Sequence, residues 1–323
     1  MKKILLLKMS SMGDLIHCLP ALTDLQQAPE WASAQVTWVA EESFIDIPPM
    51  HPMVKHVLPV ALRRWKKRLG EPQTWREYQA LKQQLRSQRW DAIVDCQGLL
   101  KSAWVARMAK QPVSGYDRHS IKEPVASYFY QHQYAVAKTL PAVERNRQLL
   151  AQALGYAVHG KPDFGLPTLA QHELTPQRAF AALIHGTSAE AKEWPEAAWV
   201  ALGQRLNQQG IACVLFWGNE REHLRAQRIA AALSDAVVMP KLSIAAAGQI
   251  IAAALAVVAV DTGLAHLANT QNRPLITLYL DSEPHLTGAI ATAHTDKVAN
   301  LGGKGQQPSV DEVWSILCQY DLF

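Results

Sequence analysis

The chain has 323 residues, 49% of them hydrophobic, which suits two domains of ordinary size with buried cores. No run of eighteen apolar residues occurs, and a lysine follows the first apolar run directly. We therefore expect neither a transmembrane helix nor a signal peptide. The four cysteines are scattered without metal-ligand spacing, which favours reduced cytosolic thiols. The net charge of +4 gives no indication of a nucleic-acid partner.

The first half of the chain alternates short apolar runs with amphipathic stretches, the pattern of a parallel sheet covered on both faces. We expect strands at 4–7, 35–40, 56–60, 92–95 and 113–116. Helices are expected at 18–27, 74–88 and 99–109. A further helix is expected at 141–154, with Pro141 at its first turn and Gly155 beyond its end.

The stretch 156–178 holds several prolines and glycines without periodicity, so the domain linker is expected there. A second α/β run follows, with strands expected at 181–184, 211–216, 256–260 and 275–279, and helices at 196–208, 220–233 and 243–254. A last helix at 310–320 begins after Ser309, a good N-cap. The predicted organisation is a domain at 1–160, a linker at 161–178, a domain at 179–308 and a terminal helix within 309–323. The predicted fold class is α/β, with two Rossmann-like doubly wound domains.

The turn after the first strand is the most informative stretch of the chain. Gly13 and Asp14 stand where a parallel strand gives way to a helix expected over 15–22, and ligands bind at such carboxyl ends of strands. Gly13 would allow a tight turn close to a ligand. Asp14 is either a catalytic carboxylate or simply the N-cap of the helix.

Five cations crowd into six residues around Trp65: Arg63, Arg64, Lys66, Lys67 and Arg68. They form either an ordinary solvated surface or a site for an anionic partner. Trp65 suits packing and contact with a lipid equally well.

In the second half, Asp261, Thr262 and Gly263 follow the apolar strand 255–260 and open a helix. Free amides at such a helix start are suited to a diphosphate. The alternative is a plain turn with Asp261 as cap, and His266 suits the protein core as well as a ligand site.

Two more turns in this half carry polar groups. Thr187 and Ser188 follow the strand 181–184, and their hydroxyls suit phosphate oxygens. Lys192, just beyond, is either a partner for a leaving diphosphate or an ordinary surface lysine. Glu222, with Glu220 as its rival, follows the next strand, where carboxylates commonly accept ribose hydroxyls.

Four segments in this order resemble the bacterial lipopolysaccharide heptosyltransferase I family: KMSSMGDLIHCLPALTD (8–24), ALRRWKK (61–67), AKEWP (191–195) and DTGLAHLA (261–268). The resemblance spans residues 1 to about 280. It implies the GT-B architecture, with the two domains facing across a cleft. It also implies inverting transfer of heptose from ADP-L-glycero-D-manno-heptose to Kdo of Kdo-lipid A in lipopolysaccharide inner-core synthesis.

The resemblance also implies roles for individual residues. Asp14 would be the general base and Lys192 the partner of the leaving diphosphate. The implied donor-binding residues are Gly13, Thr187, Ser188, Glu222, Leu242, Asp261, Thr262, Gly263, Leu264 and His266. The implied acceptor-binding residues are Ser10, Arg63, Arg64, Lys67 and Gln97.

The implied partners are the ADP-sugar, Kdo-lipid A and the cytoplasmic face of the inner membrane of a Gram-negative bacterium, which the enzyme would contact peripherally. We expect no metal and no cofactor besides the ADP-heptose donor, because the chain has no Asp-x-Asp motif and no ligand spacing of His or Cys.

The sequence departs from the family pattern in two places. Members typically carry Tyr-Gly-Pro-Thr after the last strand, where this chain has Tyr279-Leu280-Asp281-Ser282. They carry Ala-Thr-Thr where it has Gly186-Thr187-Ser188. The alternatives left open are a heptosyltransferase II-like enzyme adding a later heptose, a nucleotide-sugar epimerase of the same architecture, and a non-catalytic lipid- or nucleotide-binding module.

Overall fold

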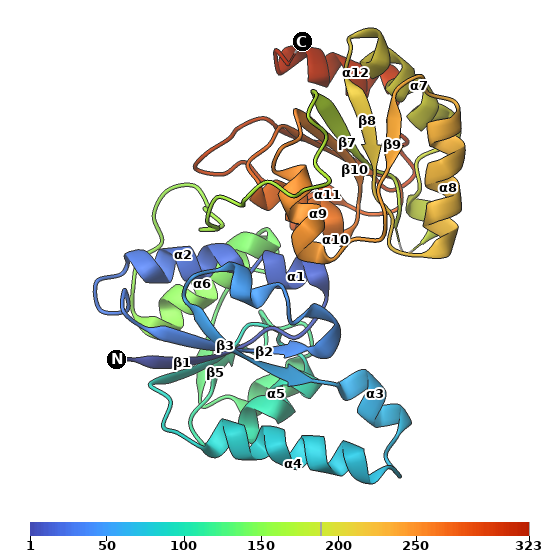
Figure 1. The fold of residues 1–323 in the computed structure, drawn as a ribbon. Coiled ribbons are helices and arrows are strands. Elements are labelled where there is room, and N and C mark those ends of the chain that lie inside the picture. Colours follow the sequence, from blue (N-terminus) through green and yellow to red (C-terminus); the bar gives the residue numbers. More distant parts are fainter. Residues whose placement is uncertain (188, 323) are drawn as a thin grey trace. The chain divides into compact units, whose positions relative to one another are not determined.

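The computed structural model describes residues 1–187 and 189–322 and divides into two compact units, Met1–Pro167 and Thr168–Phe323 (Figure 1). The division after Pro167 falls in a stretch without regular secondary structure that runs from 155 to 179. In the described residues, no helix combines the length and the apolar character that a membrane span requires.

Unit 1 is built on a six-stranded parallel sheet with strand order β3-β2-β1-β4-β5-β6. Its strands are β1 (Lys3–Leu7), β2 (Gln35–Glu41), β3 (Val54–Val60), β4 (Ala92–Asp95), β5 (Ser114–Tyr116) and β6 (His132–Tyr134). The central strand β1 is apolar and buried from Ile4 onward, as expected for a strand covered on both faces.

Helices connect these strands. They are α1 (Met12–Ile16), α2 (Leu19–Gln27), α3 (Leu62–Lys67), α4 (Pro72–Arg86), α5 (Leu100–Arg107) and α6 (Ala142–Leu154), with short 3₁₀ turns η1 (Glu42–Phe44), η2 (Pro48–Met50) and η3 (Pro124–Phe129). As predicted, Gly155 ends α6 in the left-handed conformation, at φ 75°.

Unit 2 repeats the topology, with strand order β12-β11-β10-β7-β8-β9. Its strands are β7 (Phe180–Ile184), β8 (Ala212–Leu215), β9 (Ala236–Val238), β10 (Ala256–Val260), β11 (Leu275–Tyr279) and β12 (Val298–Gly302). Its helices are α7 (Glu196–Gln208), α8 (Glu220–Ala231), α9 (Ile244–Ile251), α10 (Gly263–Thr270), α11 (Pro284–Thr287) and α12 (Val310–Gln319), with the 3₁₀ turn η4 (Glu190–Lys192).

The core of unit 2 follows from the alternation of side chains along its buried strands. Leu183 and Val258 pack on one face of the sheet with residues of α7, α8 and α12. Ala182 and Val257 pack on the other face with residues of α9 and α10. The terminal helix α12 thus belongs to unit 2, and Ser309 caps it by accepting a hydrogen bond from the Glu312 amide at 3.2 Å, as predicted.

The fold class, two doubly wound α/β domains, is confirmed by the two parallel sheets. One predicted helix is wrong. The stretch 15–22 is not one helix, because α1 ends at Ile16 and α2 begins at Leu19, with Pro20 in its first turn. A proline there supplies no amide to a continuous helix, so a new helix starts instead.

Candidate functional site

Each sheet places several of its predicted site residues at the point where the strand order reverses. In unit 2 the neighbouring strands β7 and β10 start connections that leave in opposite directions, and 185–187 and 261–263 follow these two strands. In unit 1 the corresponding strands are β1 and β4, followed by Ser10 and Gln97. Such switch points leave a crevice at the carboxyl ends of the strands, where α/β proteins bind ligands.

Asp261 is the centre of the cluster in unit 2. Its Oδ2 lies 2.6 Å from Lys192 Nζ and accepts a hydrogen bond from Ser282 Oγ at 2.7 Å. The side chain of Asp261 is only 12% exposed, whereas that of Lys192 is 29% exposed. The lysine side chain therefore remains more open to solvent than the carboxylate that it neutralises.

The pKa of Asp261 reflects two opposing effects. Burial alone would raise it, but the hydrogen bonds from Lys192 and Ser282 outweigh burial and hold the pKa of this carboxyl below its usual range. Asp261 is therefore a carboxylate at neutral pH. The structure brings the two residues predicted to flank the donor together as an ion pair.

Thr187 supports this arrangement from β7. Its side chain is buried, and its Oγ1 donates a hydrogen bond to the Asp261 carbonyl oxygen at 3.0 Å. The hydroxyl predicted to bind phosphate is thus engaged in fixing the turn after β10. Ser188, the other predicted hydroxyl, lies outside the described residues.

The helix α10 begins beside Asp261, as predicted. Thr262 is its N-cap residue, and within the described residues its side chain makes no capping hydrogen bond. Gly263 and Leu264 form the first turn and are half-buried, whereas His266 is buried. The amides of this turn, with their helix dipole, offer positive potential to an anion.

Glu222 lies in the first turn of α8, directly after β8. Its carboxylate accepts hydrogen bonds from the Gly218 amide at 2.7 Å and from Asn219 Nδ2 at 2.8 Å. A Cβ atom on Gly186 would lie 2.6 Å from Glu222 Cδ, so the loops after β7 and β8 meet closely here. Leu242, just before α9, packs half-buried against the second face of the core.

In unit 1 the predicted acceptor residues Ser10 and Gln97 are in contact. Gln97 Oε1 accepts hydrogen bonds from the amides of Met9 and Ser10, at 2.8 and 3.1 Å. Lys101 Nζ donates to Ser10 Oγ at 3.2 Å. The cluster therefore combines a hydroxyl, an amide and a cation at the switch point of this sheet.

Asp14 is the third residue of α1, so its predicted alternative role as the N-cap is wrong. Ser11 occupies the N-cap position, and Asp14 Oδ2 accepts a hydrogen bond from the Ser11 amide at 2.8 Å. Asp14 is half-buried and lies shortly after the end of β1. The tight turn predicted at Gly13 is also wrong, since Gly13 lies buried inside α1.

The cationic stretch forms α3, at the end of the edge strand β3. Arg63, Lys66, Lys67 and Arg68 are exposed. Arg64 instead forms ion pairs with Glu42 at 2.9 Å and Glu77 at 2.8 Å, and it holds the pKa of Glu77 at about 2. Trp65 is buried and donates to Glu77 at 2.6 Å, so its role is packing.

Comparisons with known proteins agree with this geometry. The pattern of glycosyltransferase family 9 (heptosyltransferase) matches residues 78–316. The chain belongs to this family. It is 45% identical over 289 residues to lipopolysaccharide heptosyltransferase 1 of Pseudomonas aeruginosa, covering 89% of this chain and 81% of that protein.

Two further comparisons refine the family-9 assignment. The solved structure of E. coli heptosyltransferase WaaC with ADP is 36% identical, with a TM-score of 0.89, and covers 98% of this chain and 99% of that one. Lipopolysaccharide heptosyltransferase 2 of E. coli K12 is 32% identical over 141 residues, which cover 42% of this chain and 40% of that protein.

Sequence reasoning missed three residues of this family-9 glycosyltransferase: Ser282, Lys101 and Arg225. Ser282 falls in the segment that departs from the family pattern, and its position just after β11 is the only signal for it. Arg225 is 5% exposed, donates to the His185 carbonyl oxygen at 2.6 Å and pairs with Glu193 at 3.5 Å. It holds the start of the loop that carries Thr187 and Lys192.

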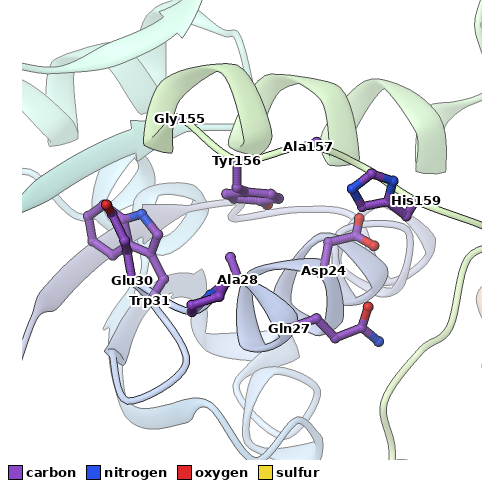
Figure 2. A pocket seen from close by; sticks show the side chains of 10 residues that line it. Asp24, Gln27, Ala28, Glu30, Trp31, Gly155, Tyr156, Ala157 and His159 are labelled. Atoms are coloured by element: carbon purple, nitrogen blue, oxygen red, sulfur yellow. The ribbon is translucent and has the colours of Figure 1, made fainter.

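A pocket of about 360 Å³ lies elsewhere in unit 1 of the family-9 enzyme, between the end of α2 and the segment after α6 (Figure 2). Trp31, Tyr156 and His159 line it, together with Asp24, whose carboxylate is engaged by Arg147 at 2.7 Å. None of the predicted site residues lines this pocket. Among the described residues no three His, Cys, Asp or Glu side chains are grouped as metal ligands.

Proposed function

We propose that this glycosyltransferase moves a heptose from ADP-L-glycero-D-manno-heptose to a Kdo residue of Kdo-lipid A. The observation that carries the proposal is the similarity to lipopolysaccharide heptosyltransferase 1 over 89% of the chain. The sequence match to heptosyltransferase 2 covers less than half of the chain, which favours the first heptose over a later one. The relative solved with ADP supports an ADP-linked donor.

The donor diphosphate is proposed to lie at the first turn of α10, beside Lys192. Two sources of positive charge meet there, the amides of Thr262–Leu264 and the ammonium group of Lys192, whose side chain stays 29% exposed beside Asp261. Asp261 then accepts hydroxyls of the sugar, and Glu222 accepts those of the ribose. Leu242 borders the adenine, and His266 lies near Asp261.

In the proposed reaction Asp14 takes the proton from a Kdo hydroxyl, whose oxygen forms a bond to the anomeric carbon. The bond from that carbon to the diphosphate oxygen breaks on the opposite face, so the configuration inverts. ADP leaves with its charge balanced by Lys192 and the helix amides. Ser10, Gln97, Arg63 and Lys67 are proposed to bind the acceptor, and Arg64 to hold α3 in place through its ion pairs with Glu42 and Glu77.

No divalent metal is required in this proposal, because a lysine and a helix start offset the diphosphate charge. Activity should therefore persist in excess EDTA. If EDTA abolished activity and Mg²⁺ or Mn²⁺ restored it, the proposal of a metal-independent reaction would be overturned.

The proposal as a whole is tested with a donor panel of ADP-heptose, UDP-glucose and GDP-mannose, each incubated with purified Kdo-lipid A. We expect nucleotide release from ADP-heptose alone, and only when the acceptor is present. Turnover of a nucleotide sugar without acceptor would favour the epimerase, and tight binding without turnover would favour a binding module. A requirement for an acceptor that already carries heptose would favour the later heptosyltransferase. We place the enzyme peripherally on the cytoplasmic face of the inner membrane, where that acceptor is anchored.

A further inference from the structure

Positive charge is concentrated in one part of unit 1. Residues 62–110 contain twelve Lys and Arg but only four Asp and Glu, a net charge of +8, whereas the whole chain carries +4. The helices α3, α4 and α5 carry most of these cations. Lys66 on α3, Arg76 on α4 and Arg107 on α5 are all exposed. Such a surface attracts an anionic partner.

The same helices expose a row of aromatic side chains. Trp75 is 53% exposed and Trp104 is 45% exposed. Tyr78 lies between them, stacked on Trp104 with ring centroids 5.6 Å apart and in edge contact with Trp75 at 6.0 Å. Leu69 and Leu100 are exposed at 59% and 42%. The stacking joins α4 to α5, and the Arg64–Glu77 ion pair joins α3 to α4, so the three helices form one continuous surface (Figure 1).

The two tryptophans of this aromatic row are exposed, unlike several others in the chain. Trp65, Trp194 and Trp199 are all buried. Trp75 is held outward, because its Nε1 donates to the Leu69 carbonyl oxygen at 2.8 Å. Exposed indole and phenol rings beside Lys and Arg suit the interface of an anionic membrane, where rings lie among the head groups and cations meet phosphates.

The surface also leads to the acceptor cluster. Lys101, in the first turn of α5, contacts Ser10, and Trp104 follows one turn later on the same helix. A lipid whose chains remain in the membrane beneath the aromatic row would thus have its sugar head group near Ser10 and Gln97. We propose that α3, α4 and α5 form a membrane-docking surface, in which Trp75, Tyr78 and Trp104 enter the interface of an anionic bilayer. This inference rests on the proposed function, because the lipid acceptor explains why the surface lies beside that cluster.

Binding to vesicles tests the surface directly. The full chain is sedimented with phosphatidylglycerol–phosphatidylcholine vesicles and with phosphatidylcholine vesicles, and tryptophan fluorescence is recorded with brominated lipids. Wild type should bind the anionic vesicles, less so at high salt, and its fluorescence should be quenched. Trp75→Ser with Trp104→Ser should lose most of the quenching and weaken binding about tenfold or more. Lys66→Glu with Arg76→Glu should weaken binding by a similar factor.

Two matched variants serve as controls. Leu224→Ser removes an exposed apolar side chain of unit 2, and Lys138→Glu with Lys304→Glu makes the same change in charge at exposed lysines outside the surface. Both controls should bind vesicles like wild type. The inference is overturned if wild type does not bind anionic vesicles, or if the surface variants bind as wild type does. It is also overturned if wild type is a dimer that the aromatic variant dissociates, because a second copy would then cover the surface.

Transfer to a soluble, deacylated Kdo acceptor separates this inference from the proposed function. We expect the surface variants to keep wild-type turnover of that acceptor. Absence of transfer by wild type, with vesicle binding intact, would overturn the proposed function and leave the docking surface in place. Transfer to the soluble acceptor without vesicle binding would overturn the docking surface and leave the proposed function in place.

Discussion

Lys192 Nζ lies 2.6 Å from Asp261 Oδ2 and thereby joins two loops that are 69 residues apart in the sequence. The loops leave neighbouring strands, β7 and β10, at the point where the strand order reverses. Both side chains are less than one-third exposed, so removing one charge leaves the other in a partly buried place without its partner. The pair is thus the main electrostatic feature of the candidate donor site.

Lys192→Ala should lower kcat/KM for the ADP-sugar by about two to three orders of magnitude, because the leaving diphosphate loses its cation. Lys192→Arg retains the charge and should retain more activity than Lys192→Ala. Asp261→Asn should also raise the donor KM, since the variant loses the carboxylate that accepts the sugar hydroxyls and holds Lys192 in place. Steady-state kinetics with ADP-heptose measures all three, and an unchanged donor kcat/KM in Lys192→Ala would contradict the role of the pair.

Asp14→Asn should lower turnover by at least about two orders of magnitude, the usual contribution of a general base. The amide oxygen of Asn can still accept the hydrogen bond from the Ser11 amide, so thermal stability should stay near that of wild type. Asp14→Ala removes both functions and should also lose about 1 kcal/mol of stability. If Asp14→Asn turned over like wild type, Asp14 would serve α1 and not the reaction.

Ser282→Ala should raise the pKa of Asp261 and lower kcat/KM by about tenfold, because one hydrogen bond to the carboxylate is lost. Ser282→Thr keeps the hydroxyl, as the threonine of the family pattern would, and should behave like wild type. The pH profile of donor kcat/KM is the measurement. Equal profiles for Ser282→Ala and wild type would show that Lys192 alone fixes Asp261.

Arg63→Ala with Lys67→Ala should raise the KM for the acceptor and leave the KM for the donor unchanged, since both cations are exposed and without acidic partners in the described residues. The effect should shrink as salt rises, because ions screen exposed charges. Arg64→Ala differs, since it also breaks two ion pairs and should lower the thermal midpoint. A rise in the donor KM instead would reverse the assignment of the two units.

Buried His185 makes stability depend on pH. Burial, reinforced by the charge of Arg225, lowers the pKa of His185 from 6.5 to about 4. The unfolded chain therefore binds a proton that the folded chain does not, so stability is full above pH 6.5 and falls as the pH drops towards about 4. The loss amounts to about 3 kcal/mol at most. His51 in unit 1, whose pKa is also about 4, should act in the same way.

Thermal unfolding of wild type and His185→Gln at about pH 7.5 and about pH 5 measures this dependence. The variant should be less stable at the higher pH and lose less on acidification. An equal loss in both proteins would exclude His185 as the cause.

Features that depend on neighbouring residues were predictable from the sequence. The ends of α6 and α12 follow from Gly155 and Ser309, whose local conformations need no distant partner. The polar turns after β7 and β10 were predictable because strand ends in doubly wound sheets meet at one edge. The edge strands β6 and β12 were not predicted, because HQY and VANLG are short and polar or half-exposed.

Contacts between distant segments could not be predicted from the sequence. Ser282 reaches Asp261 over 21 residues and Lys101 reaches Ser10 over 91, and neither separation leaves a periodic signal. The sequence also provides no indication that Trp65 is buried whereas Trp75 is exposed. Both lie within the cation-rich segment 62–110, and only the packing of α3 on α4 decides which ring faces solvent.

The most direct test of the account is analysis of the product that wild type makes from ADP-heptose and Kdo-lipid A. Mass spectrometry and NMR should show one heptose attached to Kdo, with the anomeric configuration opposite to that of the donor. The release of ADP should match the heptose transferred. A product with the donor's configuration, or ADP released without any transfer to Kdo, would contradict the account.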